Sequence, residues 1–281
     1  MATNQMRRDA AKRKLASQQA RRAQQAARRR RIAVISSAAV VVIVLVAVVA
    51  LSTIGRGGSD APASAAPSDA ASATSAAQPA AGGPGTCAYP ADGSAAKQNT
   101  PPPTEGVSSE GTVSVALATS AGPIGLTLNR AEAPCTVNSF VSLAGQGYFD
   151  GTGCHRLTTG EGLKVLQCGD PTGTGTGGPG YTIPDEAPTT LAAAPSGQGT
   201  VTYPRGTVAM AKTAQPNSGG SQFFLVYADS TLPPEYTVFG TIDEAGLTTI
   251  DKVAAKGTDD ANSSGDGKPK TPIEIQTATV S

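Results

Sequence analysis

The chain has 281 residues, with 22 Lys and Arg against 21 Asp and Glu and a single histidine. Its length allows one or two domains, but the 33 glycines and 21 prolines are clustered and there is no tryptophan, which favours one. The charge is also divided: residues 1–31 carry eleven basic residues and one acidic residue, whereas the remainder carries eleven basic and twenty acidic residues. The net charge of +1 for the whole chain therefore describes neither part of it.

An apolar stretch, residues 32–54, follows the basic arm of residues 1–31 and contains four Ser and Thr residues but no charged residue. About 20 apolar residues cross the hydrocarbon core of a bilayer as a helix. Four arginines at 28–31 precede this stretch and only Arg56 follows it closely, so the N-terminus is expected in the cytoplasm and the C-terminal part outside it. We therefore expect a single-pass protein of the cell membrane whose helix contacts lipid, with the arm near anionic headgroups.

A cleaved signal peptide is the alternative interpretation of residues 32–54. Small residues at 61–65 offer a cleavage site, but a signal peptide has an apolar region of only about 7–15 residues. The length of the stretch favours a retained anchor. Nucleic-acid binding by the arm is disfavoured, because residues 1–31 include no aromatic side chain on which bases would stack.

A linker is predicted over residues 55–110. In residues 55–86, 26 of 32 residues are Ala, Gly, Ser or Pro, which cannot bury enough apolar surface to fold. Three prolines at 101–103 extend the spacer to about Glu110, and the segment around Cys87 is a candidate for docking on the folded part. Residues 111–281 are then the ordered domain, long enough for one core.

Most of the periodicity in this domain is that of strands. Apolar side chains alternate with smaller ones over 113–117 and over 124–128, on either side of a turn at 121–123. Further strands are predicted at 153–158, 164–168, 207–211, 222–226, 237–241 and 273–280. Helical spacing predicts helices over 134–144 and 247–256. This pattern predicts a mainly β fold, a small closed barrel with helices over its ends.

All four cysteines follow the predicted anchor, in a compartment where disulfides persist. Cys154 and Cys168 fall on strands that we expect to pair, which favours a bridge between them and would leave Cys87 for Cys135. Three pairings are possible for four cysteines, and the sequence does not choose among them. A zinc site is not expected, because there is no C-x-x-C pair and His155 is the only histidine.

Six segments carry most of the functional information. They are C-H-R-L at 154–157, V-L-Q-C-G-D at 165–170, G-T-G-G-P-G-Y at 175–181, G-T-V-A-M-A at 206–211, P-N-S-G-G-S-Q-F-F at 216–224 and V-F-G at 238–240. In this order they resemble the cyclophilins, over about residues 112–280. The resemblance implies an eight-stranded antiparallel barrel and peptidyl-prolyl cis–trans isomerisation without a metal or cofactor.

The resemblance also assigns residues. Arg156 matches the catalytic arginine of the family, Gln167 the glutamine that positions arginine and substrate, and Phe224 the floor of the proline pocket. The positions that match the substrate groove are His155, Val165, Gly175, Ala211, Gln222, Leu232 and Tyr236. Lys164 stands where the family usually has an aromatic residue, and the hairpin before Gln167 is longer than in compact members.

The chemistry fits these residues. Isomerisation of an X–Pro bond has a barrier of about 18–20 kcal/mol, because amide resonance must be broken. No bond is cleaved, so an apolar slot for the proline ring and a fixed donor toward the prolyl nitrogen are what the site must provide. Arginine suits this role, since it is always protonated and presents a rigid fork of donors. We expect a monomer that acts on proline-containing polypeptides; the alternative is a binding module with the same fold and little turnover.

Two other motifs point elsewhere. Residues 175–180 fit G-x-G-x-x-G, but Pro179 interrupts the helix that a dinucleotide site requires. His155, Asp170 and Ser218 follow the chain order of the trypsin-like proteases, with N-S-G-G around the serine. An exported protease remains a second class of function, although about 170 residues are few for a double barrel and the S-Q-F-F continuation favours the cyclophilins.

Overall fold

The computed structural model describes residues 85–195, 197 and 199–281. The predicted basic arm, the predicted anchor and the predicted linker up to residue 84 lie outside the described residues. Within the described ranges, no helix is both long and apolar enough to cross a bilayer.

The first two strands form a regular hairpin. In β1 (Thr112–Thr119) every second side chain is buried, and β1 pairs with β2 (Gly122–Asn129) from Thr112 opposite Asn129 to Thr119 opposite Gly122. The turn requires a glycine at position 122, whose φ is +135°. The other strands are β3 (Thr152–Gly153), β4 (Arg156–Thr158), β5 (Val165–Cys168), β6 (Val201–Tyr203), β7 (Thr207–Met210), β8 (Phe223–Val226), β9 (Ser230–Leu232), β10 (Val238–Ile242), β11 (Asp266–Gly267) and β12 (Glu274–Val280).

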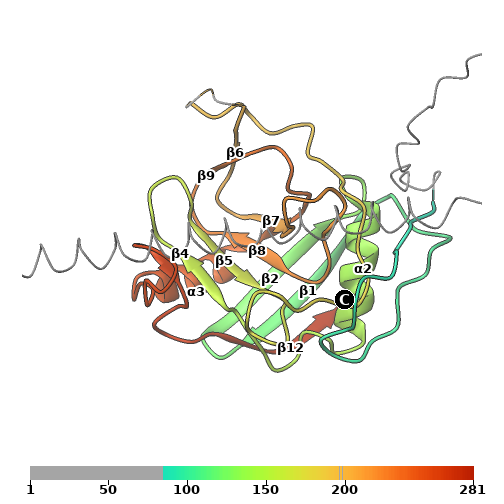
Figure 1. Ribbon diagram of the computed structural model, residues 1–281, viewed down its shortest axis with the longest axis horizontal. Coiled ribbons are helices and arrows are strands. Elements are labelled where there is room, and N and C mark those ends of the chain that lie inside the picture. Colours follow the sequence, from blue (N-terminus) through green and yellow to red (C-terminus); the bar gives the residue numbers. More distant parts are fainter. Residues whose placement is uncertain (1–84, 196, 198) are drawn as a thin grey trace, which may run out of the picture. The chain divides into compact units, whose positions relative to one another are not determined.

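Ten strands form one antiparallel sheet in the order β11-β4-β5-β8-β7-β10-β2-β1-β12-β3, and β6 pairs with β9 beside it (Figure 1). The prediction of a closed eight-stranded barrel is wrong: the sheet is a curled half-barrel, since β11 and β3, at its two ends, do not pair with each other in the described part of the chain. Each of these end strands has two residues, too few for a ladder that would close the sheet. All eight predicted strands overlap observed ones.

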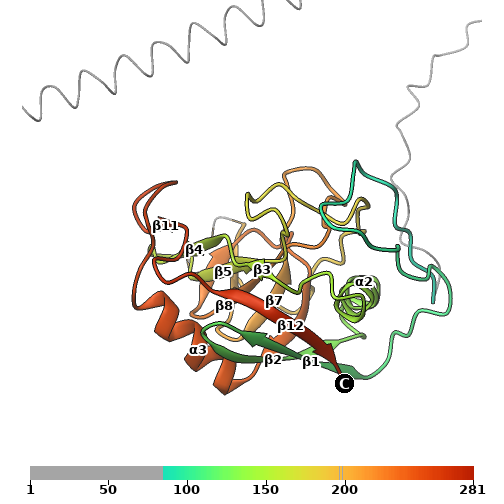
Figure 2. The same ribbon diagram turned by 90° about the horizontal axis from the view of Figure 1, so that it is seen from below.

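The two predicted helices are confirmed, and Figure 2 shows them toward opposite ends of the curled sheet. α2 (Pro134–Gly145) buries Phe140 and Leu143, and α3 (Glu244–Ala254) buries Ile250 and Val253. α3 begins three residues earlier than predicted, because the carboxylate of Asp243 caps it by accepting a hydrogen bond from the N–H of Gly246 at 2.7 Å.

Aromatic side chains fill the main core between α2 and the sheet. The ring of Phe140 lies 4.8 Å from that of Phe149, 5.1 Å from that of Phe223 and 5.3 Å from that of Phe239, measured between centroids. Phe223 is fully buried there. Because neighbouring strand residues face opposite sides of a sheet, Phe224 points away from this core.

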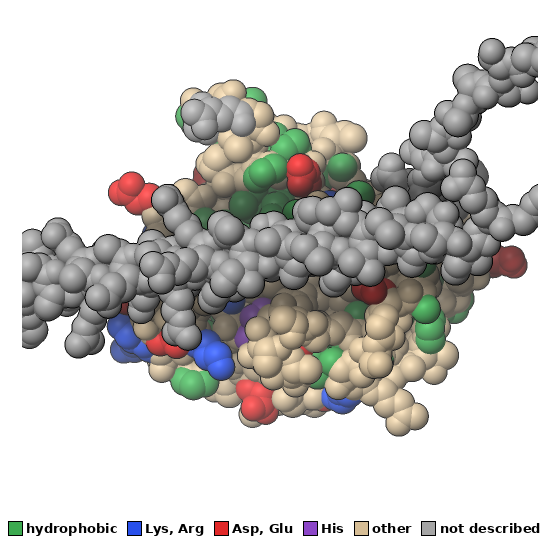
Figure 3. All heavy atoms as spheres, viewed as in Figure 1, with side chains coloured by type: hydrophobic (Ala, Val, Ile, Leu, Met, Phe, Trp, Pro, Cys, Tyr) green, Lys and Arg blue, Asp and Glu red, His purple; other side chains and the backbone are tan. Residues whose placement is uncertain are grey.

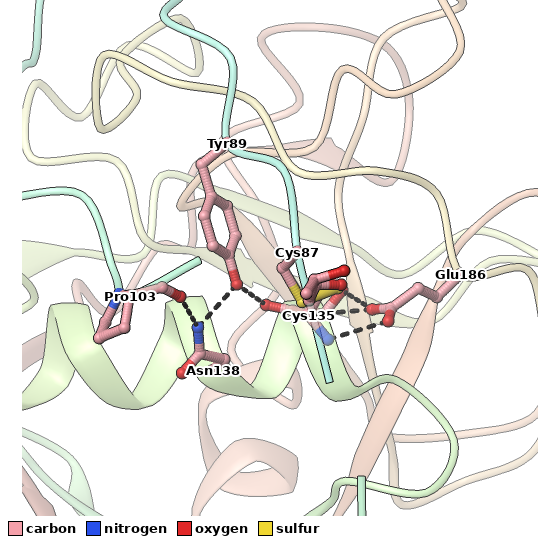
Figure 4. Close-up of a disulfide and its surroundings, with 8 residues drawn as sticks. Cys87, Tyr89, Pro103, Cys135, Asn138 and Glu186 are labelled. Atoms are coloured by element: carbon pink, nitrogen blue, oxygen red, sulfur yellow. Dashed lines mark hydrogen bonds between the residues drawn. A yellow bond between two sulfur atoms is a disulfide. The ribbon is translucent and has the colours of Figure 1, made fainter. Parts of the chain in front are cut away.

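Residues 85–110, here called the strap, run alongside α2 (Figures 1 and 2). The disulfide Cys87–Cys135 joins the strap to the first turn of the helix, and Cys154–Cys168 is the second disulfide, so both favoured pairings are confirmed. Figure 4 shows Tyr89 donating its hydroxyl to the carbonyl of Cys135, at 2.9 Å. Part of the predicted linker is therefore packed on the domain.

Glu186 supplies the cap that the start of α2 lacks. The helix begins after Ala133, which makes no capping bond with its side chain. The carboxylate of Glu186 instead accepts hydrogen bonds from the N–H groups of Cys135 and Thr136, each at 2.9 Å (Figure 4). Burial raises the pKa of Glu186, and these hydrogen bonds oppose the rise.

Loss of the strap disulfide is expected to destabilise the domain. We predict that Cys87→Ser with Cys135→Ser lowers the free energy of unfolding by about 2–4 kcal/mol, because the bridge closes a long loop and so restricts the unfolded chain. Denaturant unfolding of the full chain measures this.

The second disulfide is the matched control. Its cysteines are 14 residues apart in sequence rather than 48, so removing it is expected to cost about 1 kcal/mol less in loop entropy. Equal stability of the strap variant and the wild type would contradict the strap's structural role.

Candidate active site

Three of the residues predicted to be catalytic lie in one row across the sheet. Arg156 on β4 pairs with Gln167 on β5, Gln167 pairs with Phe224 on β8, and Phe224 pairs with Ala209 on β7. Directly opposed residues of neighbouring strands share a face of the sheet. The strand register therefore places the arginine, the glutamine and the phenylalanine side by side on the face opposite the main core.

A second apolar cluster, here called the groove cluster, covers this face. Its buried members are Val165, Tyr203, Ala209, Phe224 and Val226, and Leu163, Leu191, Val201, Ala211, Leu232, Tyr236 and Val238 are packed against it. The ring of Phe224 lies 5.6 Å from that of Tyr236 in an edge-on arrangement. The predicted site residues Val165, Ala211, Leu232 and Tyr236 thus surround Phe224.

Tyr203 is a member of the groove cluster that the sequence analysis missed. It is fully buried, and its hydroxyl bonds the carbonyls of Pro233 and Tyr236 and the N–H of Tyr236. Burial raises the pKa of Tyr203 to about 12. The residue therefore fixes the segment that carries Tyr236. Its short strand β6 has too few residues to show a periodicity.

A chain of polar side chains runs along the row. Arg156 Nη1 donates to Gln167 Oε1 at 3.4 Å, and Gln167 Nε2 donates to Gln222 Oε1 at 2.9 Å. Gln222 Nε2 in turn donates to the carbonyl of Gly177 at 3.0 Å. The structure thus links three predicted site residues to the glycine-rich loop at 175–180.

Asp266 on β11 holds the other side of the arginine. Arg156 Nε donates to Asp266 Oδ1 at 2.9 Å and Arg156 Nη2 to Asp266 Oδ2 at 2.7 Å. The bond with Asp266 raises the pKa of Arg156 against the effect of burial, and the same bond lowers the pKa of Asp266. Asp266 was not predicted, because it lies 110 residues further along the chain in a loop with other acidic residues.

The glycine-rich loop is built on a buried carboxylate. Asp170 accepts hydrogen bonds from the N–H groups of Thr172 at 2.7 Å and Gly175 at 2.7 Å, and it is fully buried. Burial raises the pKa of Asp170, but the hydrogen bond from the hydroxyl of Thr172 and the bonds from these N–H groups outweigh it, and the net shift is downward. A Cβ at Gly177 would lie 2.0 Å from Asp170 Oδ1, so only glycine fits there. Gly175 is thereby held beside the ring of His155.

His155 is half-buried and lines one of two hollows beside the row. Its two ring nitrogens have no hydrogen-bond partner among the described residues. Burial lowers the pKa of His155 below 6.5, and the charges of Arg156 and Lys268 lower it further against the opposing charge of Asp170.

The hollows have volumes of about 550 Å³ and about 490 Å³. Both are lined by Gln167 and Gly175; the larger one also by Ala211, Gln222 and the strap residues 92–94, and the smaller one by His155, Arg156 and residues 259–268 in part. Six predicted site residues therefore line one or both of these hollows.

The charged end of Lys164 is held by a hydrogen bond. Its Nζ donates to the carbonyl of Thr159, within the same hairpin, at 2.6 Å. The ammonium group is thus bound to the backbone, and only the aliphatic stem of the side chain stands where an aromatic ring was expected.

The alternative motifs do not form the sites that they would require. The hydroxyl of Ser218 bonds Thr213 and the carbonyl of Gln215, not His155, so the protease triad is not assembled. Residues 175–180 form a loop, to which the strap is hydrogen-bonded through Ala96 N and the carbonyl of Gly178. Within the part of the chain that the structure describes, no three His, Cys, Asp or Glu side chains are grouped as metal ligands.

Comparisons with known proteins identify the family of the chain. The family described as cyclophilin type peptidyl-prolyl cis-trans isomerase/CLD matches residues 114–280, and the chain belongs to this family. It is 54% identical over 194 residues to the probable peptidyl-prolyl cis-trans isomerase B of Mycobacterium leprae, covering 68% of this chain and 65% of that protein. It is 59% identical over 165 residues to the protein of the same description from Mycobacterium tuberculosis, covering 58% and 53%.

The chain therefore spans between half and two thirds of the length of these relatives. Among solved structures, a cyclophilin-type peptidyl-prolyl cis-trans isomerase of Cryptosporidium parvum aligns with a TM-score of 0.49 and 28% identity, over 61% of this chain and 98% of that one.

The single histidine provides a direct test of the site's electrostatics. We predict that its imidazole titrates below pH 6.5 in the full chain. Because the pKa is lower in the folded state, stability from the neutral ring is fully present above pH 6.5 and is lost as the pH falls through the folded pKa. NMR titration of the ring protons measures it without ambiguity.

Lys268→Gln is expected to raise that pKa, since it removes one of the charges that lower it. Lys252→Gln, on the outer face of α3, is the control and is expected to leave it unchanged. A pKa at or above 6.5 in the wild type would contradict the burial of the ring.

Proposed function

We propose that the chain is a peptidyl-prolyl cis–trans isomerase that acts on proline-containing segments of polypeptides. The observation that carries the proposal is the row of Arg156, Gln167 and Phe224, set by strand register beside the groove cluster. Membership of the cyclophilin-type family supports it.

The proline ring would lie against the groove cluster, where Phe224 and Tyr236 present aromatic surface. From β4, Arg156 would donate to the prolyl nitrogen, whose lone pair becomes free as the amide twists out of resonance. This hydrogen bond is stronger to the twisted amide than to either planar isomer, so it lowers the barrier rather than only binding the substrate. Gln167 would orient both the arginine and the substrate backbone.

A polypeptide fits the surroundings of the row better than a nucleic acid does. Four of the eleven residues that line the smaller hollow are Gly or Ala, and its basic residues are Arg156, which is paired with Asp266, and Lys268. His155, the purple side chain in Figure 3, lines the same hollow. Hydrogen-bonding groups line the larger hollow, including the side chain of Gln222 and the residues of the glycine-rich loop. We also propose that the domain acts as a monomer.

We further propose that the protein is exported and held at the cell membrane by residues 32–54, with its isomerase domain outside the cytoplasm. The charge distribution around that stretch supports this topology. The disulfides support it too, since all four cysteines are paired and disulfides persist in oxidising compartments. Its clients would be exported proteins that are folding or assembling.

A proline-binding module with little turnover is the second candidate function. The observation that favours it is Lys164, whose ammonium group donates to the carbonyl of Thr159 and which stands where the cyclophilins usually have an aromatic residue. The two functions differ in what Arg156 contributes: an isomerase needs it for the rate, whereas a binding module needs it only for affinity.

Turnover by the full chain decides between them. We predict that the oxidised wild type accelerates cis-to-trans conversion of a prolyl peptide, which takes tens to hundreds of seconds uncatalysed. Arg156→Ala is expected to lower kcat/KM by about 100-fold or more, because it removes the donor that stabilises the twisted amide. Peptide binding, measured by NMR, is expected to weaken much less.

Arg205→Ala is the matched control. Arg205 also forms a two-pronged ion pair, with Asp251, but lies outside the row and the groove cluster. Its loss is expected to leave kcat/KM unchanged. A folded wild type that binds the peptide without accelerating its conversion would establish the binding module, and Lys164→Phe would then be expected to increase turnover.

A further inference from the structure

We infer that Asp266 is a positioning residue of the isomerase site, which acts by fixing the guanidinium of Arg156. The inference rests on the proposed function. It starts from the ion pair between the two side chains, whose nitrogen and oxygen atoms approach to 2.7 Å with both side chains partly exposed, 35% for the arginine and 20% for the aspartate.

The geometry of the pair determines which donors remain for substrate. An arginine has five N–H donors. Asp266 accepts one from Nε and one from Nη2, and Gln167 accepts one from Nη1. One N–H on each Nη atom is left without a partner in the described part of the chain. A bidentate carboxylate fixes the plane of the guanidinium, so the direction of these two donors is set before substrate arrives.

The loop that carries Asp266 is itself held in place. Asp259 Oδ1 accepts hydrogen bonds from the N–H groups of Ala261 and Lys268, and Asp260 Oδ1 accepts one from Gly265. A Cβ at Gly267 would lie 2.0 Å from Asp259 Oδ1, so the backbone there admits only glycine. The loop therefore presents the carboxylate from a fixed position.

Pairing with β4 connects this loop to the row. Asp266 and Gly267 pair with Thr158 and Leu157, the two residues that follow Arg156. Asn262 Nδ2 also donates to Asp266 Oδ1 at 3.0 Å. Asn262, in the same loop, thus orients the carboxylate of Asp266. The pairing of β11 with β4 sets the position of Asp266 relative to Arg156.

Positioning and sequestration predict opposite results. If Asp266 aims the arginine, its loss lets a long flexible side chain leave the required geometry, and turnover falls. If Asp266 only withdraws the arginine from substrate, its loss frees the donors and turnover rises. The two free N–H groups favour positioning.

The test compares Asp266→Asn with Asp251→Asn in the full chain. Asp251 is the matched control, since it also accepts two hydrogen bonds from one arginine, Arg205, away from the site. We expect Asp266→Asn to lower kcat by about 10- to 100-fold with little change in KM, Asp266→Glu to restore part of the loss, and Asp251→Asn to have no effect.

A double-mutant cycle separates positioning from general stability. In the Arg156→Ala background Asp266→Asn is expected to cause no further loss of kcat, because the residue acts through the arginine. The Nε–H resonance of Arg156 is expected to shift in Asp266→Asn even if thermal stability is unchanged.

Three results would overturn the inference: an unchanged kcat in a folded Asp266→Asn variant, an increased kcat, or a further loss in the Arg156→Ala background. Absence of turnover in the wild type would instead refute the proposed function, so the two failures are distinguishable.

Discussion

The alternation of side chains along the central strands is the constraint on which both the core and the site depend. Phe223 and Phe224 are neighbours in sequence, yet one packs among the core aromatic rings and the other anchors the groove cluster. The same alternation on β5 puts Gln167 in the row and Cys168 on the core side, where it is bonded to Cys154. A shift of one residue in the register of β8 would exchange these environments and dismantle the site together with the core.

Arg156 is a partly buried cation and needs hydrogen-bond partners. Asp266 and Gln167 provide them and leave two of its N–H donors free among the described residues. Desolvation disfavours a charged group, and Asp266 opposes this effect on Arg156. Asp266 binds Nε and Nη2 of the guanidinium, and Gln167 binds Nη1. Gln167 is in turn hydrogen-bonded to Gln222. In the isomerase that we propose, the arginine would be a donor whose geometry is fixed before binding, and such preorganisation is a source of electrostatic catalysis.

Local patterns predicted most of the fold, whereas apart from the two disulfides the side-chain contacts between distant residues were not predicted. Strand patterns in the sequence identified every strand of four or more residues, but β3 and β11 are too short to show a period, and they decide that the sheet stays open. The resemblance to cyclophilins named Arg156, Gln167 and Phe224, and strand register brings these together, although their roles stay predictions. Asp266 and Tyr203 had no local signal, since each acts through a partner remote in sequence.

The strap connects the core to the site, because it contacts both the helix of the core and the loop of the site. At one end Cys87 is bonded to α2, and further along Asp92 and Ala96 donate to the carbonyls of Gly180 and Gly178. The preceding residue of that loop, Gly177, accepts the hydrogen bond of Gln222. The loop is therefore hydrogen-bonded to the strap on one side and to the polar row on the other. A segment that was predicted to be a linker thus lines the larger hollow, through residues 92–94.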